Sequence, residues 1–87
     1  MKVHELKTIP PYFGMVTEGR KHFEFRKNDR DFRIGDIILL NEYRNGIYTG
    51  QWDFVEITEV INDCVIGIPL GYVIMEIRRV RFFPLGG

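Results

Sequence analysis

Cysteine is nearly absent from this sequence, because Cys64 stands alone among 87 residues. A single cysteine excludes an internal disulfide, and one cysteine with two scattered histidines does not match the ligand spacing of a zinc site. Since Cys64 is followed by Val65 and Ile66, we expect a buried thiol that packs as a small hydrophobic side chain. The low cysteine content fits a reducing compartment, and we expect a cytoplasmic protein.

Other absences narrow the possible functions. No hydrophobic run has the length of a membrane span or a signal peptide, so no membrane association is expected. The sequence has no Gly-rich phosphate loop, no Walker lysine and no dinucleotide-binding fingerprint, and no Ser-His-Asp arrangement follows from its spacing. We therefore expect neither a cofactor nor a bound metal.

Net charge is lacking as well, because twelve basic residues balance twelve acidic ones. The whole protein therefore exerts no general attraction on nucleic acid. The charges are nevertheless segregated: six of the twelve Lys and Arg residues fall within 20–33, and acidic residues dominate 42–63. Two arrangements fit this pattern, namely one basic face on a neutral protein, or two segments that face each other across a sheet and cancel.

The residues that are present describe one small domain, spanning residues 1–87, with no repeat or linker. Hydrophobic residues make up 45% of the chain, which is ordinary for a soluble globular protein. Seven Phe, four Tyr and one Trp are a generous aromatic supply for a core of this size.

The apolar pattern predicts five short strands and one short helix. We expect the strands at residues 3–8, 22–27, 36–43, 51–61 and 71–78. The predicted fold is α+β and mostly β: a small, mostly antiparallel sheet that curls into a barrel, with the helix near its N-terminus.

The helix is expected at about 10–18, because prolines precede it and Gly19 offers a left-handed C-cap after it. An apolar stripe of Tyr12, Met15 and Val16 is expected to face the core.

Further along, an Asn-Gly turn signal lies in a loop expected at 44–50. The strand expected at 51–61 changes phase near Phe54-Val55, where we predict a bulge.

The stretch Gly19–Asp36 carries the strongest functional signal. Its centre alternates strictly, which is typical of a half-buried strand. We expect Phe23 and Phe25 in the core, with Glu24 and Arg26 side by side on the opposite face. Lys21 enters just before them. Such fixed charges suit a polar ligand, although an ordinary surface salt bridge has the same pattern.

The same residues resemble a known family. Gly19-Arg20-Lys21-His22-Phe23-Glu24-Phe25-Arg26 resembles the Gly-x-Lys-x-x-Glu-x-Arg signature of the ASCH domain, a branch of the PUA-like superfamily. Phe32-Arg33-Ile34-Gly35-Asp36 is similar to the turn that follows it there, and residues 71–77 are similar to the family's last strand. The resemblance covers nearly the whole chain and is particularly strong for a compact bacterial and phage group of unknown function.

The resemblance implies a PUA-like β-barrel whose cleft binds RNA or a nucleotide. Lys21, Glu24 and Arg26 would line this cleft, with the two cations holding a phosphate. Glu24 would accept a hydrogen bond from an exocyclic amine of a base. Four aromatic residues are candidates for stacking on a base, with core packing as the alternative: Tyr12, Tyr43, Tyr48 and Trp52. We include Tyr12 and Tyr43 among the predicted ligand-binding residues.

Two other functions stay open. One ASCH relative is an amidohydrolase that deacetylates N4-acetylcytidine, and this chain resembles it in Gly19-Arg20-Lys21 and Arg26. Glu24 stands where that enzyme has a threonine, so a hydrolase here would need Lys21 and Glu24 as its catalytic residues in a new role. Because Glu24 would keep Lys21 charged, we expect no turnover of N4-acetylcytidine. The remaining alternative is a small adaptor that binds a protein partner.

Overall fold

The computed structural model describes residues 1–63 and 66–80. The prediction of a buried thiol at Cys64 lies outside these residues. The elements, in chain order, are β1 (Val3–Thr8), α1 (Tyr12–Thr17), β2 (Phe23–Lys27), β3 (Ile37–Arg44), β4 (Ile47–Asn62) and β5 (Tyr72–Arg79). The predicted five strands and one short helix are therefore confirmed.

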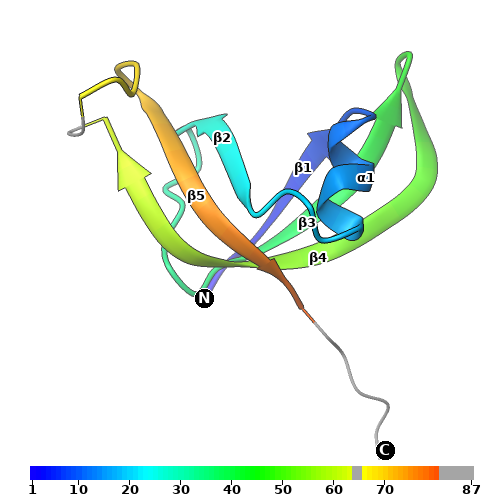
Figure 1. Ribbon diagram of the computed structural model, residues 1–87, viewed down its shortest axis with the longest axis horizontal. Helices are drawn as coiled ribbons and strands as arrows, with labels where there is room; N and C mark the ends of the chain where they lie inside the picture. The colour runs from blue at the N-terminus through cyan, green and yellow to red at the C-terminus, as the bar shows by residue number, and fades with distance from the viewer. Residues whose placement is uncertain (64–65, 81–87) are drawn as a thin grey trace, which may run out of the picture.

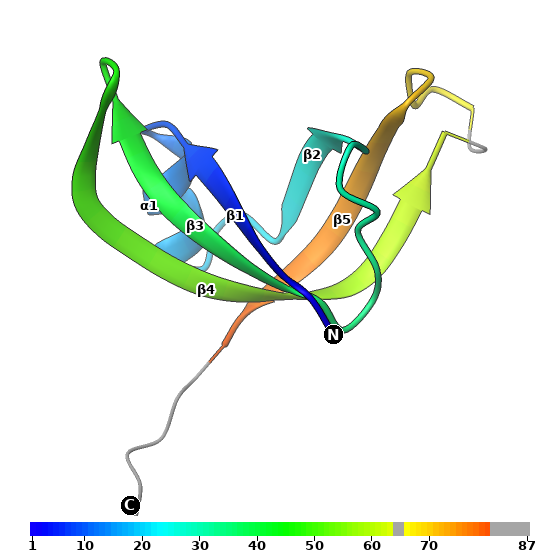
Figure 2. The ribbon, with the colours of Figure 1, turned by 180° about the vertical axis from the view of Figure 1, so that it is seen from behind.

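The five strands form one mixed sheet in the order β1-β3-β4-β5-β2. Three neighbouring pairs are antiparallel, and β1 runs parallel to β3. The long strand β4 bends strongly, so the sheet curls into a half-barrel with β3 on one limb and β5 on the other (Figure 1). The two edge strands, β1 and β2, lie inside the curl, and their free edges face each other (Figure 2).

The core occupies the inner face of this half-barrel. Its most deeply buried side chains alternate along three neighbouring strands, as the apolar pattern of β5 predicted: Ile38, Leu40, Val55, Ile57, Val73 and Met75. From α1, Phe13 and Val16 join them. The predicted stripe on α1 is therefore wrong in part, because Phe13 faces the core and Tyr12 is exposed.

Two predictions around β4 are also wrong. The loop expected at 44–50 is only a two-residue turn, because Asn45 and Gly46 both adopt positive φ (51° and 82°) and β4 begins at Ile47. Such a pair suits a tight hairpin. Pairing with β3 continues without a break through Phe54-Val55. The register shifts of β4 lie on either side of this point, opposite Asn41–Tyr43 of β3 and between Ile57 and Glu59 in the pairing with β5.

The phase predicted for β2 is inverted. Phe23 and Phe25 are 49% and 46% exposed, whereas Glu24 is only 2% exposed. Glu24 pairs with Met75 of β5, whose side chain is in the core, so Glu24 points to the inner face. Burial of this carboxylate is tolerated because two cationic side chains bind it. Phe25 instead stacks on Tyr72 outside the barrel, with ring centroids 5.3 Å apart.

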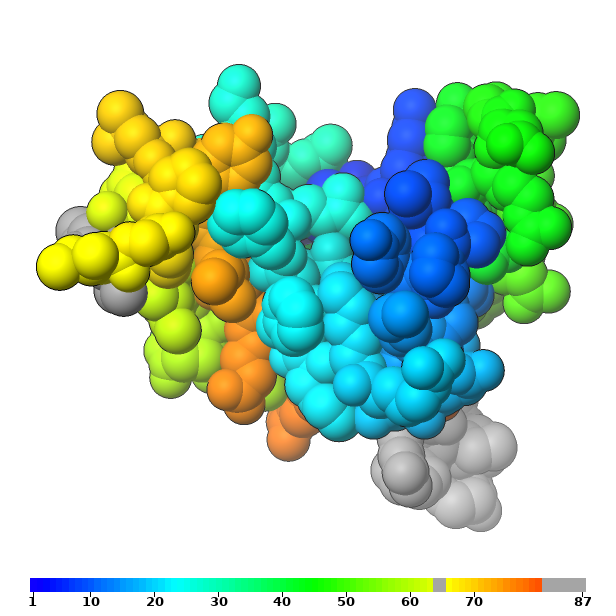
Figure 3. Space-filling model, turned by 45° about the horizontal axis from the view of Figure 1, so that its top comes forward, coloured from blue at the N-terminus to red at the C-terminus, as the bar shows by residue number. Residues whose placement is uncertain are grey.

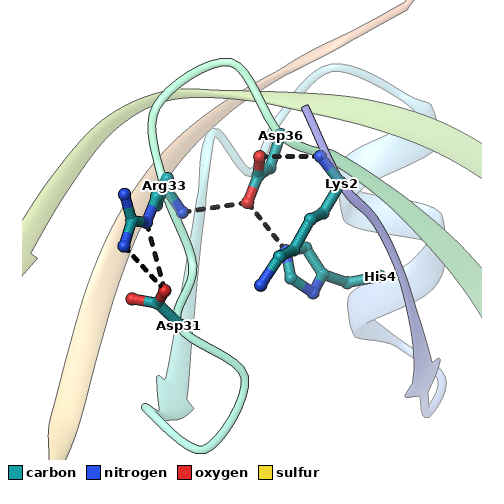
Figure 4. Close-up of polar contacts among 5 residues, drawn as sticks. All are labelled: Lys2, His4, Asp31, Arg33 and Asp36. Carbon is teal, nitrogen blue, oxygen red and sulfur yellow. Dashed lines mark hydrogen bonds and ion pairs between the residues drawn. The ribbon is translucent and has the colours of Figure 1, made fainter.

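A buried carboxylate anchors β1 to the turn before β3 (Figure 4). Asp36, in the turn before β3, accepts hydrogen bonds from His4 Nε2 (2.8 Å), the Lys2 backbone N–H (3.0 Å) and the Arg33 backbone N–H (3.1 Å). Gly35 makes this turn possible because its φ of 93° is strained for other residues.

Two opposing effects act on the pKa of Asp36. Burial alone would raise it, since water no longer solvates the charge. The hydrogen bond from His4 and those from the backbone of Lys2 and Arg33 outweigh burial, and the pKa lies below its ordinary value. Asp36 is therefore held as a carboxylate in the folded protein.

Within residues 1–63 and 66–80, no helix has the length and apolar character needed to cross a membrane. The same residues contain no group of three or more His, Cys, Asp or Glu side chains placed to hold a metal ion.

Candidate functional site

A cavity of about 520 Å³ lies where the free edges of β1 and β2 approach each other beside α1. We call it the seam pocket, and its lining residues are Lys7, Thr8, Ile9, Tyr12, Lys21, Phe23, Glu24, Phe25 and Arg26. On this side of the molecule the cyan residues around β2 lie directly beside the blue residues of α1 (Figure 3). The volume is within the range of small-molecule sites.

Glu24 is the centre of the polar contacts in the seam pocket. Its Oε1 accepts a hydrogen bond from Lys21 Nζ (2.8 Å), and its Oε2 accepts one from Arg26 Nε (2.9 Å). The Glu24 side chain is 3% exposed, whereas those of Lys21 and Arg26 are 15% and 28% exposed. The structure thus brings together the three charged residues of the signature, with the cations nearer to solvent.

The end of α1 places Lys21 at this position. Gly19 adopts a φ of 77°, the left-handed conformation predicted for a C-cap. The backbone N–H groups of Arg20 and Lys21 both donate to the carbonyl of Met15, at 2.8 and 2.9 Å. The chain therefore turns sharply and delivers Lys21 beside the first residues of β2.

Arg26 connects the two edges of the sheet. Its Nη2 donates to the backbone carbonyl of Lys7 (2.9 Å) and lies 3.4 Å from Thr8 Oγ1, both at the end of β1. The same guanidinium binds Glu24 through Nε, so it is fixed from two sides. Sequence reasoning missed Lys7 and Thr8, because no motif marks β1 as the strand opposite β2.

Two aromatic rings flank the Lys21 ammonium group. Its Nζ lies 5.1 Å from the ring centroid of Phe23 and 5.7 Å from that of Tyr12, within cation–π range. Both rings are about half exposed. Tyr12 was predicted to contact the ligand, whereas Phe23 was missed because we assigned it to the core.

Tyr43 is not part of the seam pocket. Its ring centroid lies 4.6 Å from Lys7 Nζ, and it packs edge-on against Tyr48 with centroids 5.1 Å apart. Lys7 therefore stands between the seam pocket and this tyrosine pair. Trp52, another candidate for stacking, lies against Phe54 and is largely exposed, away from the lining of the pocket.

The charges of the seam pocket leave it cationic. Lys7, Lys21 and Arg26 face a single carboxylate, that of Glu24. The acidic residues of β4 do not neutralise it, because Asp53 and Glu56 form ion pairs with arginines of β5. The sequence left two arrangements open, one basic face or cancellation between the basic and acidic segments across the sheet. These two ion pairs do not join the acidic segment to the basic one.

The pocket offers a defined set of contacts to a ligand. Among the described residues, Lys21 Nζ donates to Glu24 alone, so two of its three N–H groups are available. Ring faces of Tyr12 and Phe23 stand next to these donors. An anion and a flat, apolar group can thus be bound next to each other.

The sequence comparisons place the chain in a family. Residues 3–77 match the family model described as a domain of unknown function, DUF3850. The chain belongs to this family. Its matched region includes every residue that lines the seam pocket.

A curated protein of Escherichia phage P2 is also similar to this chain. It is described as an uncharacterized 12.9 kDa protein in the GpA 3′ region, and it is 44% identical over 59 residues, or 68% of this chain. The match covers 54% of the phage protein, so this chain spans about half the length of its relative. The predicted relation to a phage group of unknown function is confirmed, and the relation to ASCH domains stays a prediction.

Proposed function

We propose that this DUF3850 domain binds RNA or a nucleotide in the seam pocket. The observation that carries the proposal is the position of Lys21, whose ammonium group stands between two half-exposed aromatic rings in a cationic cavity. Nucleotides combine a flat base with an anionic phosphate, and proteins commonly bind them by pairing aromatic rings with cationic side chains.

Each part of the pocket has a role in this proposal. Lys21 and Arg26 donate hydrogen bonds to a phosphate, and the base stacks on Tyr12 or Phe23. Glu24 acts mainly by positioning, because its two oxygens hold the two cations at 2.8 and 2.9 Å before a ligand arrives. Such preorganisation lowers the entropy cost of binding.

The resemblance of residues 19–26 to the ASCH signature supports the same proposal. The contacts of Lys21 favour binding over amide hydrolysis, because its Nζ is engaged by the buried carboxylate of Glu24 at 2.8 Å and is not placed as a free base.

Calorimetric titration with the four ribonucleoside 5′-monophosphates and short single-stranded RNAs tests the proposal. Lys21→Ala and Arg26→Ala should each weaken binding about tenfold, the loss expected for one charge-assisted hydrogen bond. Higher salt should weaken binding by the wild type, because phosphate contacts release counterions.

Two exposed cations outside the pocket provide matched controls. Lys27 lies on the outer face of β2, and Arg20 forms an exposed ion pair with Glu18. Lys27→Ala and Arg20→Ala should leave affinity within about twofold of the wild type. If the wild type binds none of the nucleotides or RNAs, the proposal is wrong and the protein-adaptor hypothesis gains.

A further inference from the structure

A second cavity adjoins the seam pocket and shares two of its cations. This adjoining pocket has a volume of about 560 Å³ and is lined by Glu5, Leu6, Lys7, Arg26, Arg30 and Tyr48. Lys7 and Arg26 also line the seam pocket. The two cavities are therefore neighbours along the seam between β1 and β2, and the bridging contact of Arg26 to β1 lies at their common boundary.

The charge of the adjoining pocket repeats that of the seam pocket. Lys7, Arg26 and Arg30 face one carboxylate, that of Glu5, which is already engaged by Asn41 Nδ2 at 2.6 Å. Arg30 is only loosely held, since its Nε lies 3.8 Å from Asp29 and its side chain is about half exposed. An arginine held so loosely is free to reach an anionic ligand.

An aromatic group also stands at the far side of the shared cations. Tyr48 lines the adjoining pocket, is half exposed and packs edge-on against Tyr43. Lys7 Nζ lies 4.6 Å from the ring centroid of Tyr43 and 5.9 Å from that of Tyr48. The order along the seam is thus aromatic rings around Lys21, then the shared cations, then a second pair of aromatic rings.

We infer that the adjoining pocket is a second nucleotide subsite, so that the preferred ligand is a single-stranded oligonucleotide and not a mononucleotide. This inference rests on the proposed function of the seam pocket. In a single strand, one phosphate links two neighbouring nucleotides, each of which carries a base. This order matches the seam, where aromatic rings stand at either end and the shared cations lie between them. Lys7 and Arg26 hold the linking phosphate, Tyr48 stacks on the second base, and Arg30 contacts the next phosphate.

The test compares ligands of two lengths on the full chain. Each ribonucleoside 5′-monophosphate and the corresponding RNA homohexamer are titrated calorimetrically into the wild type, Arg30→Ala and Tyr48→Ala. The hexamer should bind the wild type at least about tenfold more tightly than the monophosphate. Each variant should lose about three- to tenfold in hexamer affinity and leave monophosphate affinity unchanged, and Arg30→Ala should also reduce the salt slope by about one unit.

Two substitutions control for nonspecific effects. Arg33 lies in the same loop as Arg30 and is likewise paired with an aspartate, and Trp52 is an exposed aromatic residue of β4 outside both pockets. Arg33→Ala and Trp52→Ala should change neither the affinity for the hexamer nor the affinity for the monophosphate.

The outcomes separate this inference from the proposed function. Equal affinity for hexamer and monophosphate, or equal losses for both ligands in Arg30→Ala and Tyr48→Ala, would overturn the second subsite and leave the seam pocket intact. Failure of both ligands to bind would overturn both proposals. In a competition experiment, a hexaglutamate peptide is added to the complex of protein and RNA hexamer. If the peptide displaces the bound RNA as effectively as an equal concentration of competing RNA hexamer does, the protein recognises charge alone, and the second subsite is overturned.

Discussion

Glu24 and Asp36 are both buried carboxylates on a protein of 87 residues, yet their partners differ in kind. Asp36 is bound by two backbone N–H groups and the ring of His4, which is itself buried. Glu24 is bound by the ends of two long cationic side chains, which remain partly exposed. The first cluster is closed to ligands, whereas the second presents donors to a cavity.

The difference teaches how burial of a charge should be interpreted in a small fold. Backbone donors cannot move without unfolding the turn, so the Asp36 cluster fixes β1, β3 and the loop between β2 and β3 in one arrangement. Lysine and arginine side chains carry several donors each, so they can bind a ligand while they stay bonded to Glu24. We therefore interpret Asp36 as a structural residue and Glu24 as the organiser of a binding site.

Replacing Asp36 should have the largest effect on stability. Asp36→Ala leaves His4 and two backbone N–H groups without an acceptor in a buried position. We expect the free energy of unfolding to fall by about 3–5 kcal/mol, as when one partner of a buried charged network is removed. Urea denaturation, followed by circular dichroism, measures this change.

Asp29 is the matched control, because it lies in the same loop region and forms only an exposed ion pair with Arg30. Asp29→Ala should change the free energy of unfolding by no more than about 0.5 kcal/mol. Similar losses for Asp36→Ala and Asp29→Ala would contradict the structural role of Asp36.

Replacing Glu24 should have an intermediate effect. Glu24→Gln removes the charge that holds Lys21 and Arg26, but both cations are partly exposed and can turn towards water. We expect a loss of about 1–3 kcal/mol in the free energy of unfolding, clearly smaller than for Asp36→Ala. Glu18→Gln, which breaks the exposed pair with Arg20, serves as the control in the same urea experiment. A loss for Glu24→Gln as large as that for Asp36→Ala would remove the distinction between the two clusters.

Much of the fold could be predicted because its signals are local. The alternation of Val73, Met75 and Ile77 fixes the inner face of β5, and all three are buried as expected. Gly19 ends the helical segment, and Asn45-Gly46 makes the hairpin turn, each through a backbone conformation that few residues adopt. Such features depend on neighbours in sequence and not on the rest of the fold.

The phase of β2 could not be predicted in this way. Alternation separates Phe23 and Phe25 from Glu24, but it does not say which set points inward. The usual preference for apolar residues inside selects the phenylalanines. Tertiary contacts reverse that choice, since Lys21 and Arg26 bind Glu24 and Arg26 also reaches the end of β1, 19 positions away in sequence.

In the candidate site, too, only the residues that are close together in sequence could be predicted. The charged residues Lys21, Glu24 and Arg26 lie within six positions, so the signature identified them together. Lys7 and Thr8 join them only because β1 pairs in parallel with β3 and so becomes the edge opposite β2. Parallel pairing between distant strands leaves no mark on the local sequence.

The smallest expected effect is a change in the free energy of unfolding with pH that comes from Asp36. Its pKa lies below the ordinary value because hydrogen bonds from His4 and the backbone of Lys2 and Arg33 outweigh the opposing effect of burial. The folded protein therefore binds fewer protons at this site than the unfolded chain, and stability falls as acid is added. The contribution of Asp36 should be complete above about pH 5 and should decline from about pH 4, the unfolded value, through the folded pKa.

Urea denaturation of the wild type and Asp36→Asn at a series of pH values between about 3 and 7 measures this contribution as a difference. We expect the difference in the free energy of unfolding to be constant at the upper end and to shrink at the lower end. Asp29→Asn, which removes the carboxylate of an exposed pair 3.8 Å from Arg30, is measured in parallel as the control for a surface substitution. If the difference in the free energy of unfolding between wild type and Asp36→Asn persists unchanged down to about pH 3, the predicted loss of the Asp36 contribution in acid is wrong. The stability supplied by Asp36 would then come from the geometry of its hydrogen bonds, which an asparagine reproduces poorly, and not from its charge.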